Sequence, residues 1–318
     1  MKEYSKDDQI MVTIRCLTYN HEPYIRQCLD GFVMQKTNFR FEAIVHDDAS
    51  TDGTATIIKE YAEKYPDIIK PIFQKENQYS KHNGSISKIM NEYTHGKYIA
   101  LCEGDDYWID PLKLQKQVDF LETHHDYGIC HTAYINTLSY KRSKPVITTP
   151  NDRYLEIILK GEYKIGTLTT LFRRDLYINL QRHDRTQNFK LGDSPLWIEF
   201  AHCSKIKYIN DCTAVYRILN ESASHSKNIE KELAFHQSCV DCRIFYSQLY
   251  NVSIPLSAQR TYMASIKTAF MHGNKNIARR IFLQAKSENL VTSKILILYI
   301  GTLIPIFGKI IKKIYYKI

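Results

Sequence analysis

Three acidic residues lie within four positions, between a short apolar run and a proline that suits a helix start. Residues 98–102 are apolar and predict a buried strand, which ends in Glu103, Asp105 and Asp106. Gly104 lets the backbone turn sharply between these acids. Carboxylates crowded at a strand end repel one another, and a divalent cation with oxygen ligands, Mn or Mg, is the usual compensation. The pattern predicts such a metal site, and a solvated acidic turn that caps the next helix is the alternative.

A second acidic loop follows another apolar run. Residues 41–45 predict a strand, and Asp47 and Asp48 come close behind it, with Asp52 a few positions later. Asp52 can cap the helix expected from Gly53 onward, but this leaves Asp47 and Asp48 without a role. Two carboxylates at a strand end can accept hydrogen bonds from the N–H of a base and from ribose hydroxyls. The loop therefore predicts a nucleoside site.

Apolar and amphipathic segments alternate around these loops. The segments expected as strands are residues 10–17, 41–45, 68–73, 97–102, 128–135 and 166–172, and those expected as helices are 23–34, 53–65, 84–93 and 113–124. This alternation predicts βαβ units, hence an α/β fold with a mostly parallel sheet flanked by helices. Ligands bind such sheets beyond the carboxyl ends of the strands. The loops after Leu17, Val45 and Cys102 all lie at that edge.

Three motifs follow the carboxyl ends of three predicted strands. Thr18-Tyr19-Asn20, the loop of residues 46–54 and the acidic residues 103–106 occur in this order and at this spacing. Together they resemble the nucleotide-binding half of a family 2 glycosyltransferase with the GT-A fold, over about residues 10–225. The resemblance implies a Rossmann-like mixed sheet flanked by helices, with a C-terminal helical extension.

The resemblance also implies roles for individual residues. Asp48 would contact the base, with Asp47 beside it, and Asp106 would bind the metal on the sugar diphosphate, with Asp105 near the ribose and donor sugar. The implied nucleotide-sugar set is Thr18, Tyr19, Asn20, Glu22, Asp47, Asp48 and Asp105. Two positions depart from the family pattern, because His46 stands where an apolar residue is common and Glu103 where Asp is common. The roles of both stay open.

A candidate catalytic base lies further along the chain. Residues 191–197 read Leu-Gly-Asp-Ser-Pro-Leu-Trp, which is similar to the acceptor-side motif of the family. The resemblance implies that Asp193 is the catalytic base, and a carboxylate at a helix N-terminus stays ionised as a base must. The alternative is structural, since Asp193 or Ser194 can cap a helix whose first residue is Pro195.

The segment from Tyr216 to His225 is similar to the family segment that closes over the diphosphate. Arg217 can pair with phosphate, and His225 can be a metal ligand or a phosphate donor. An ordinary surface histidine is the alternative for His225.

Charge is distributed unevenly over a chain whose net charge is +9. Residues 269–318 hold seven Lys and two Arg against one Glu. Residues 295–308 are uncharged, contain Pro305 and fall short of the roughly 20 residues that span a bilayer. From Lys309 on, one helical face is apolar and the other basic, which predicts peripheral binding to an anionic membrane; its apolar residues are Ile310, Ile311, Ile314, Tyr315 and Ile318. Docking on the body of the protein or on a dimer partner is the alternative.

Composition excludes several classes. No zinc-finger, helix-turn-helix or RNA-binding pattern supports a nucleic-acid partner. The Cys239-Cys242 pair lies in a helical pattern without a second pair, so the eight cysteines are expected as free thiols in a reducing cytoplasm. The expected organisation is a glycosyltransferase domain at 1–225, with a nucleotide half to about 110 and an acceptor half beyond, a helical extension at 226–290 and a membrane-associating tail at 291–318.

The hypothesis at this stage is a metal-dependent, inverting sugar transfer. The donor is a nucleotide-sugar, with a UDP-sugar expected, and the acceptor is a hydroxyl of a glycan or of a lipid-linked acceptor in bacterial surface polysaccharide synthesis, of capsule or O-antigen type. The enzyme would act on the cytoplasmic face of the membrane. A non-catalytic, membrane-associated nucleotide-sugar-binding subunit is the alternative. A phosphatase with an aspartyl nucleophile is discounted, because Ser50 stands where that nucleophile would precede Asp52-Gly53-Thr54.

Overall fold

The computed structural model describes residues 9–81, 84–137, 154–181, 189–219, 228–253 and 258–313. The chain forms two compact units. The first comprises residues 1–155, 163–185 and 199–218, and the second comprises residues 156–162, 186–198 and 219–318. We call them the sheet unit and the helical unit.

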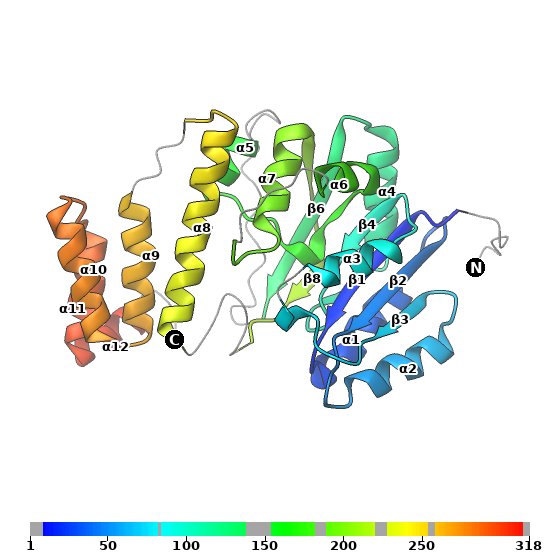
Figure 1. Cartoon of the computed structure of the whole chain (residues 1–318), viewed down its shortest axis with the longest axis horizontal. Coiled ribbons are helices and arrows are strands. Elements are labelled where there is room, and N and C mark those ends of the chain that lie inside the picture. The colour runs from blue at the N-terminus through cyan, green and yellow to red at the C-terminus, as the bar shows by residue number, and fades with distance from the viewer. Residues whose placement is uncertain are drawn as a thin grey trace. The chain divides into compact units, whose positions relative to one another are not determined.

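The sheet unit contains a mixed sheet of eight strands within the described residues, in the order β3-β2-β1-β4-β7-β6-β8-β5 (Figure 1). The strands are β1 (Val12–Thr18), β2 (Phe41–Asp47), β3 (Ile69–Phe73), β4 (Tyr98–Leu101), β5 (Tyr107–Trp108), β6 (Tyr127–Asn136), β7 (Leu171–Arg173) and β8 (Lys205–Tyr216). Strands β1 to β4 are mutually parallel, and β6 is parallel to β8. Strand β7 runs antiparallel to β4 and β6, and β5 antiparallel to β8. The predicted α/β fold with a mostly parallel sheet is confirmed.

The helices that follow the first strands begin close to their predicted positions. They are α1 (Glu22–Val33), α2 (Thr54–Lys64), α3 (Ser85–Glu92) and α4 (Lys113–Thr123). A further helix, α6 (Arg174–Gln181), was not predicted. Helix α1 shows why the periodicity was informative, since Ile25, Leu29 and Phe32 fall on one face and are fully buried. Residues 166–172 were expected as one strand but divide into a 3-10 turn (Thr167–Thr169) and β7. The long strand β8 had no counterpart among the predicted elements.

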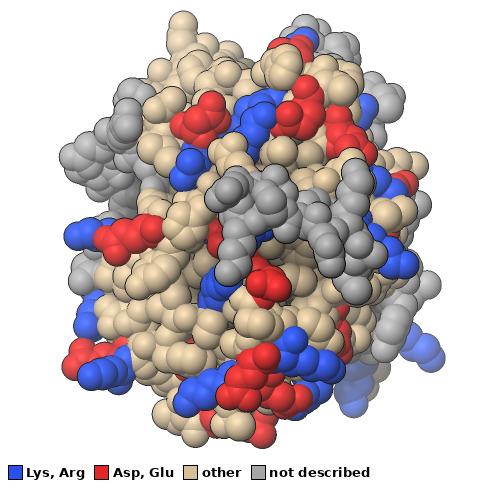
Figure 2. All heavy atoms as spheres, turned by 90° about the vertical axis from the view of Figure 1, so that its right-hand side faces the viewer, with Lys and Arg blue, Asp and Glu red and all other residues tan. Residues whose placement is uncertain are grey.

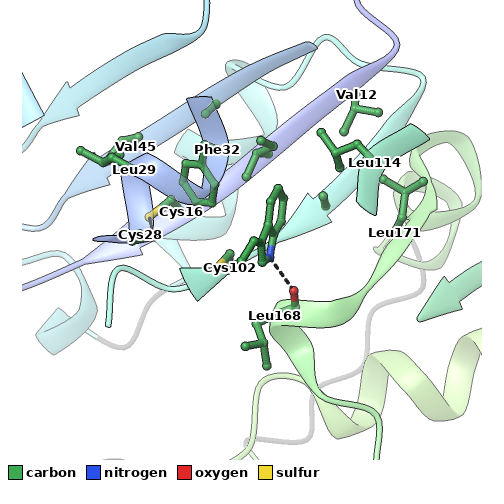
Figure 3. Close-up of a cluster of buried hydrophobic side chains, with 14 of the residues drawn as sticks. Val12, Cys16, Cys28, Leu29, Phe32, Val45, Cys102, Leu114, Leu168 and Leu171 are labelled. Carbon is green, nitrogen blue, oxygen red and sulfur yellow. Dashed lines mark hydrogen bonds between the residues drawn. The ribbon is translucent and has the colours of Figure 1, made fainter. Parts of the chain in front are cut away.

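The central core lies between β1, β2, β4 and α1 (Figure 3). Trp108 stands in its middle, directly after the acidic loop. Its ring packs edge-on against Phe32 at 5.0 Å between centroids, and its indole N–H donates to the carbonyl of Leu168 at 2.8 Å. The Nζ of the fully buried Lys113 lies 4.2 Å above the Trp108 ring, and burial lowers the pKa of Lys113 to about 7. These contacts anchor the end of the acidic loop in the core.

The helical unit packs five further helices around a core of its own: α8 (Ile229–Leu249), α9 (Ala258–Met271), α10 (Lys275–Ser287), α11 (Ser293–Leu303) and α12 (Pro305–Ile311). Helices α5 (Tyr154–Leu159) and α7 (Ser194–Cys203) each have residues in both units. Asn228, Asn274 and Thr292 cap α8, α10 and α11 by accepting backbone N–H bonds. Among the described residues, no helix is long and apolar enough to cross a membrane.

One sequence expectation about the C-terminal segment is wrong in detail. Ile310 and Ile311 were placed on one exposed apolar face, but Ile311 is buried in the core of the helical unit whereas Ile310 is exposed. The reason is that α12 begins at Pro305, which sets a new helix direction after α11. Residues 314–318 of that predicted face lie outside the described residues.

Gly96 is a position where the fold tolerates no side chain. A Cβ there would lie 2.4 Å from the Thr13 nitrogen and 2.8 Å from the Tyr98 carbonyl oxygen, both backbone atoms. We expect Gly96→Ala to lower the free energy of unfolding by about 1–3 kcal/mol, because β1 and β4 would have to separate. Urea denaturation followed by circular dichroism measures this. Gly192→Ala is the matched control, since a Cβ there meets no atom of the described residues within 4 Å. Equal losses in both variants would contradict the packing argument.

Candidate active site

The loops after β1, β2 and β4 meet at the carboxyl edge of the sheet. The backbone N–H of Asp48 donates to the Thr18 carbonyl at 3.0 Å, and the N–H of Gly104 donates to the Leu17 carbonyl at 2.9 Å. These bonds continue the parallel pairing of β1 with β2 and β4 beyond the strand ends. The three motifs that sequence analysis singled out are therefore brought together on both sides of β1.

The loops after β1 and β2 are also bound to each other. The Asn20 side-chain oxygen accepts the N–H of Thr51 at 2.8 Å, and the Asn20 N–H donates to the Ser50 hydroxyl at 2.9 Å. Glu22 accepts the N–H of Gly53 at 2.8 Å and donates its own N–H to Asp52 at 3.1 Å. The side chains of Asn20 and Glu22, both predicted nucleotide contacts, thus hold the neighbouring loop in place.

Both loops contain a residue in the left-handed backbone region without being glycine. Asn20 has φ of 54° and Ala49 has φ of 63°. Asn adopts this conformation at little cost, whereas Ala does so only under tertiary constraint. The interlocking hydrogen bonds supply that constraint, and they leave Tyr19 exposed at the rim, at 45% of its surface.

Asp47 and Asp48 are both buried, and each already has hydrogen-bond partners. Asp47 accepts the hydroxyl and the N–H of Ser50. Asp48 accepts the backbone N–H groups of Gln78 at 2.7 Å and Tyr79 at 3.0 Å, one on each carboxylate oxygen. Asp48 therefore anchors the segment after β3, while the second lone pair of each oxygen can still meet a ligand. Contact of Asp48 with a base stays a prediction.

Asp106 is the buried member of the acidic loop, at 3% exposure. One of its oxygens accepts the backbone N–H of Arg217 at 2.7 Å. Burial, followed by the nearby charges of Asp105 and Glu103, raises the pKa of Asp106 to about 9. A carboxyl group in this state favours a proton or a cation beside it.

The side chain of Arg217 also contacts the acidic loop. Its guanidinium donates to the Asp105 carbonyl and to the Gln27 side chain. The same group lies 4.4 Å from the ring centroid of Tyr107 and 5.2 Å from that of Tyr24. Arg217 follows the end of β8, so it links the acidic loop to a strand distant in sequence. Its pairing with phosphate stays a prediction.

Two buried polar atoms at this edge have no hydrogen-bond partner among the described residues. They are the Thr18 hydroxyl oxygen and Nδ1 of His21. A Cβ on Gly104 would lie 3.0 Å from the former and 2.9 Å from the latter, so the absence of a side chain there brings the acidic loop against both. Burial lowers the pKa of His21, although Asp105, Asp52 and Asp47 oppose the shift and Arg217 adds to it.

His21 is the residue that sequence reasoning missed. The motif residues on either side of it were assigned, while His21 itself was treated only as part of the turn that starts the next helix. The signal that could have found it is its place between Asn20 and Glu22.

His46 is different, because it is fully buried on β2, and neither of its ring nitrogens has a partner among the described residues. Burial lowers the pKa of His46, which favours the neutral ring.

Asp193 belongs to the helical unit. It precedes α7, and its side chain accepts the N–H of Ser194 at 2.7 Å, a bond to the first residue of the helix. The segment before it packs on α8, because Phe189 contacts the ring of Phe245 at 5.8 Å and the Lys190 N–H donates to the Ser238 hydroxyl. His225, the other predicted residue of the second half, lies outside the described residues.

The described side chains alone supply too few ligands for a divalent cation, so a bound substrate would have to supply the others. No group of three or more His, Cys, Asp or Glu side chains in the described part of the chain is arranged to hold a metal by itself. One carboxyl oxygen of Asp106 accepts the backbone N–H of Arg217, and the neighbouring Asp105 is partly exposed. Such a site suits a cation that keeps water and diphosphate oxygens as its main ligands, as Mg commonly does.

The fold and the loops together define a class of protein. A Rossmann-like sheet with acidic loops at the carboxyl ends of adjacent parallel strands, continued by an antiparallel strand pair, is the GT-A arrangement of nucleotide-sugar-dependent glycosyltransferases. The family model described as Glycosyl transferase family 2 matches residues 14–191. The chain belongs to glycosyl transferase family 2.

Similarities to individual proteins add to the family assignment. An uncharacterized protein of Mycobacterium tuberculosis is 48% identical over 209 residues, which cover 65% of this chain and 58% of that protein. This chain thus spans less than two thirds of that relative. The putative teichuronic acid biosynthesis glycosyltransferase TuaG of Bacillus subtilis is 29% identical over 222 residues, covering 68% of this chain and 82% of that protein. The chain therefore resembles glycosyltransferases of surface polysaccharide type.

Solved structures share the fold at low sequence identity. The mannosyltransferase PcManGT of Pyrobaculum calidifontis, in complex with GDP-Man and Mn²⁺, gives a TM-score of 0.55 at 18% identity and covers 98% of this chain and 89% of that chain. TarS of Staphylococcus aureus in complex with UDP-GlcNAc gives 0.52 at 15% identity, covering 92% and 90%. These similarities confirm the GT-A fold.

The raised pKa of Asp106 makes stability depend on pH. In the folded chain this carboxyl group keeps its proton up to about pH 9, but in the unfolded chain it loses it near pH 4. Rising pH between these values therefore favours unfolding of the wild type. Asp106→Asn removes the effect and keeps an oxygen for the Arg217 N–H. Without divalent cations, we expect the Tm of Asp106→Asn to exceed that of the wild type by a margin that grows from pH 5 toward pH 9. A margin independent of pH would contradict the burial argument.

Proposed function

We propose that this chain transfers a sugar, with inversion, from a UDP-sugar to a hydroxyl of a glycan or lipid-linked acceptor in the synthesis of a cell-surface polysaccharide. The observation that carries the proposal is that two buried atoms, Thr18 Oγ1 and His21 Nδ1, have no partner among the described residues and lie beside the acidic loop of a family 2 glycosyltransferase. Buried polar atoms are normally satisfied, so a missing partner at a binding edge points to a ligand.

The nucleotide would bind across the loops after β1 and β2. Thr18 and Tyr19 offer a hydroxyl and an exposed aromatic ring, and Asp47 and Asp48 offer carboxylate lone pairs for a base N–H or ribose hydroxyls. Asn20 and Glu22 would contribute by holding these loops. A UDP-sugar donor is supported by the fold shared with TarS, which was solved with UDP-GlcNAc.

The diphosphate would lie between the acidic loop and Arg217. Asp106 would hold Mn or Mg, with Asp105 near the donor sugar and His225 as a further metal ligand or phosphate donor. When bound, the cation neutralises the charge that develops on the diphosphate leaving group. The Arg217 guanidinium would add a second positive charge, exchanging its bond with the Asp105 carbonyl for one with a phosphate oxygen. The complex of PcManGT with GDP-Man and Mn²⁺ supports a cation in this fold.

Asp193 would be the catalytic base. Its carboxylate would take the proton of the acceptor hydroxyl as that oxygen forms a bond to the anomeric carbon and the bond to the diphosphate breaks. Attack from the face opposite the leaving group inverts the anomeric centre without a covalent intermediate. The acceptor class is supported by TuaG, whose name places it in teichuronic acid biosynthesis. We propose that the reaction takes place at the cytoplasmic face of the membrane.

The nucleotide site is tested by removing the unpartnered hydroxyl. Thr18→Val keeps the side-chain shape, and we expect it to weaken UDP binding about 5- to 10-fold, the loss of one hydrogen bond. Isothermal titration calorimetry with UDP and Mn measures the affinity. Thr123→Val is the matched control, because its hydroxyl bonds only within and next to α4. UDP affinity unchanged by Thr18→Val would remove Thr18 from the site.

The base is tested separately from binding. We expect Asp193→Asn to lower sugar transfer at least about 100-fold while UDP-sugar affinity stays within twofold of wild type, because only proton removal is lost. Release of UDP in the presence of acceptor measures transfer, and calorimetry measures binding. Asp241→Asn, on the exposed side of α8, is the matched control. Wild-type protein that binds UDP-sugars but transfers none to any acceptor would favour the non-catalytic alternative.

A further inference from the structure

The corner between α11 and α12 exposes a continuous run of apolar side chains. Leu303, Ile304, Ile306 and Phe307 are all exposed, with Ile306 at 77% of its surface, and Ile310 extends the run by one helical turn. Pro305 lies within the run and is exposed too. We call these six residues the apolar corner. Single exposed apolar residues are common, but contiguous ones usually mark a binding surface.

Packing inside the helical unit holds the corner in this orientation. A Cβ on Gly308 would lie 2.4 Å from the Gly301 carbonyl oxygen, so the two glycines let α11 and α12 approach closely. Ile311 reaches inward and fills the space above Gly301 beside Phe270. Because Ile311 faces the core, Ile310 and the residues one turn earlier must face away from it.

The C-terminal segment that forms the corner carries side-chain charges of one sign. Residues 289–318 contain five lysines and no acidic residue. Lys309 on α12 and Lys313, two residues after its end, are exposed, whereas Lys312 turns inward to donate to the Met271 carbonyl at 3.1 Å. That bond places the turn between α9 and α10 next to α12, and exposed Lys275 opens α10 there. On the face drawn in Figure 2, by contrast, acidic and basic side chains are interspersed.

From these observations we propose that the apolar corner inserts into the interfacial region of an anionic lipid bilayer, with Lys309, Lys313 and Lys275 on the lipid headgroups. An exposed apolar surface flanked by exposed lysines, on a segment that contains no acidic residue, matches that interface, where an apolar face enters about 5–10 Å into the boundary between headgroups and acyl chains. The amphipathic surface differs from the one expected from sequence, because it is the turn between two helices rather than one face of the last helix. The inference concerns docking alone and does not depend on which sugar is transferred.

Flotation of the full chain with lipid vesicles tests the charge requirement. We expect binding to phosphatidylcholine vesicles that contain phosphatidylglycerol and little binding to phosphatidylcholine alone. Each of Lys309→Gln and Lys313→Gln should lower the partition coefficient about fivefold, which corresponds to about 1 kcal/mol per basic residue near the surface. Lys59→Gln and Lys64→Gln on α2 are the matched controls and should leave it unchanged. An equal loss of vesicle binding in both pairs of variants would contradict the proposed binding site.

A second variant tests the apolar contact. Ile306→Ser with Phe307→Ser should reduce vesicle binding at least about tenfold without lowering the Tm, because both side chains are exposed in the folded protein. Ile244→Ser with Leu249→Ser, two exposed residues of α8, is the control. If sedimentation shows a dimer that the first double variant dissociates, while vesicle binding persists, the corner is an interface between copies and the membrane assignment is wrong.

Insertion depth gives a direct readout. Phe307→Trp introduces an exposed tryptophan, whereas the two native tryptophans, Trp108 and Trp197, are buried. Vesicles of lipids brominated on their acyl chains should quench the fluorescence of the added tryptophan when the protein binds them. Without vesicles the fluorescence of Phe307→Trp should stay unquenched. No quenching in vesicles that bind the protein would show that another surface makes the contact.

Discussion

The candidate site depends on the hydrogen bonds that leave the carboxyl end of β1. The Leu17 carbonyl accepts from Gly104 on one side and the Thr18 carbonyl accepts from Asp48 on the other, so one strand end sets the separation of the two acidic loops. A Cβ at Gly104 would overlap Thr18 and His21, at 2.8 Å from the Thr18 Cβ and 2.9 Å from the His21 Nδ1, which makes glycine a packing requirement as much as a turn residue. The loops are therefore held before any ligand arrives, and preorganisation of this kind lowers the cost of binding.

The acidic loop shows how such a site disfavours the ionised form of a carboxyl group that has no cation beside it. Asp106 is buried beside two other carboxyl groups, and its neighbours compensate only in part, through the Arg217 backbone N–H and the guanidinium above Tyr107. Trp108 and the buried Lys113 anchor the residues that follow, so the loop cannot relax by moving Asp106 toward solvent. A buried carboxylate held against its own solvation is a strong ligand for whatever cation or proton can reach it.

The candidate functional residues are distributed over both units. The sheet unit holds the motifs after β1, β2 and β4 together with Arg217, while the helical unit holds Asp193 and the apolar corner. The family match ends near the start of α7, and the relative from Mycobacterium tuberculosis shares 65% of this chain. What the remaining helices contribute must therefore be argued from their own surfaces.

The sequence by itself determined the alternation of strands and helices, the sheet class and the order of the acidic motifs, because local periodicity and turn residues carry that information. It could not show that Asn20 and Glu22 bind the next loop or that Asp48 also binds the segment after β3, since these depend on contacts between residues about thirty positions apart. Nor could it show that Nδ1 of His21 is buried without a partner among the described residues. The same holds for the C-terminal helices. Their composition indicated an amphipathic segment, but only the close approach of Gly301 and Gly308 decided that Ile311 faces the core and Ile306 faces outward.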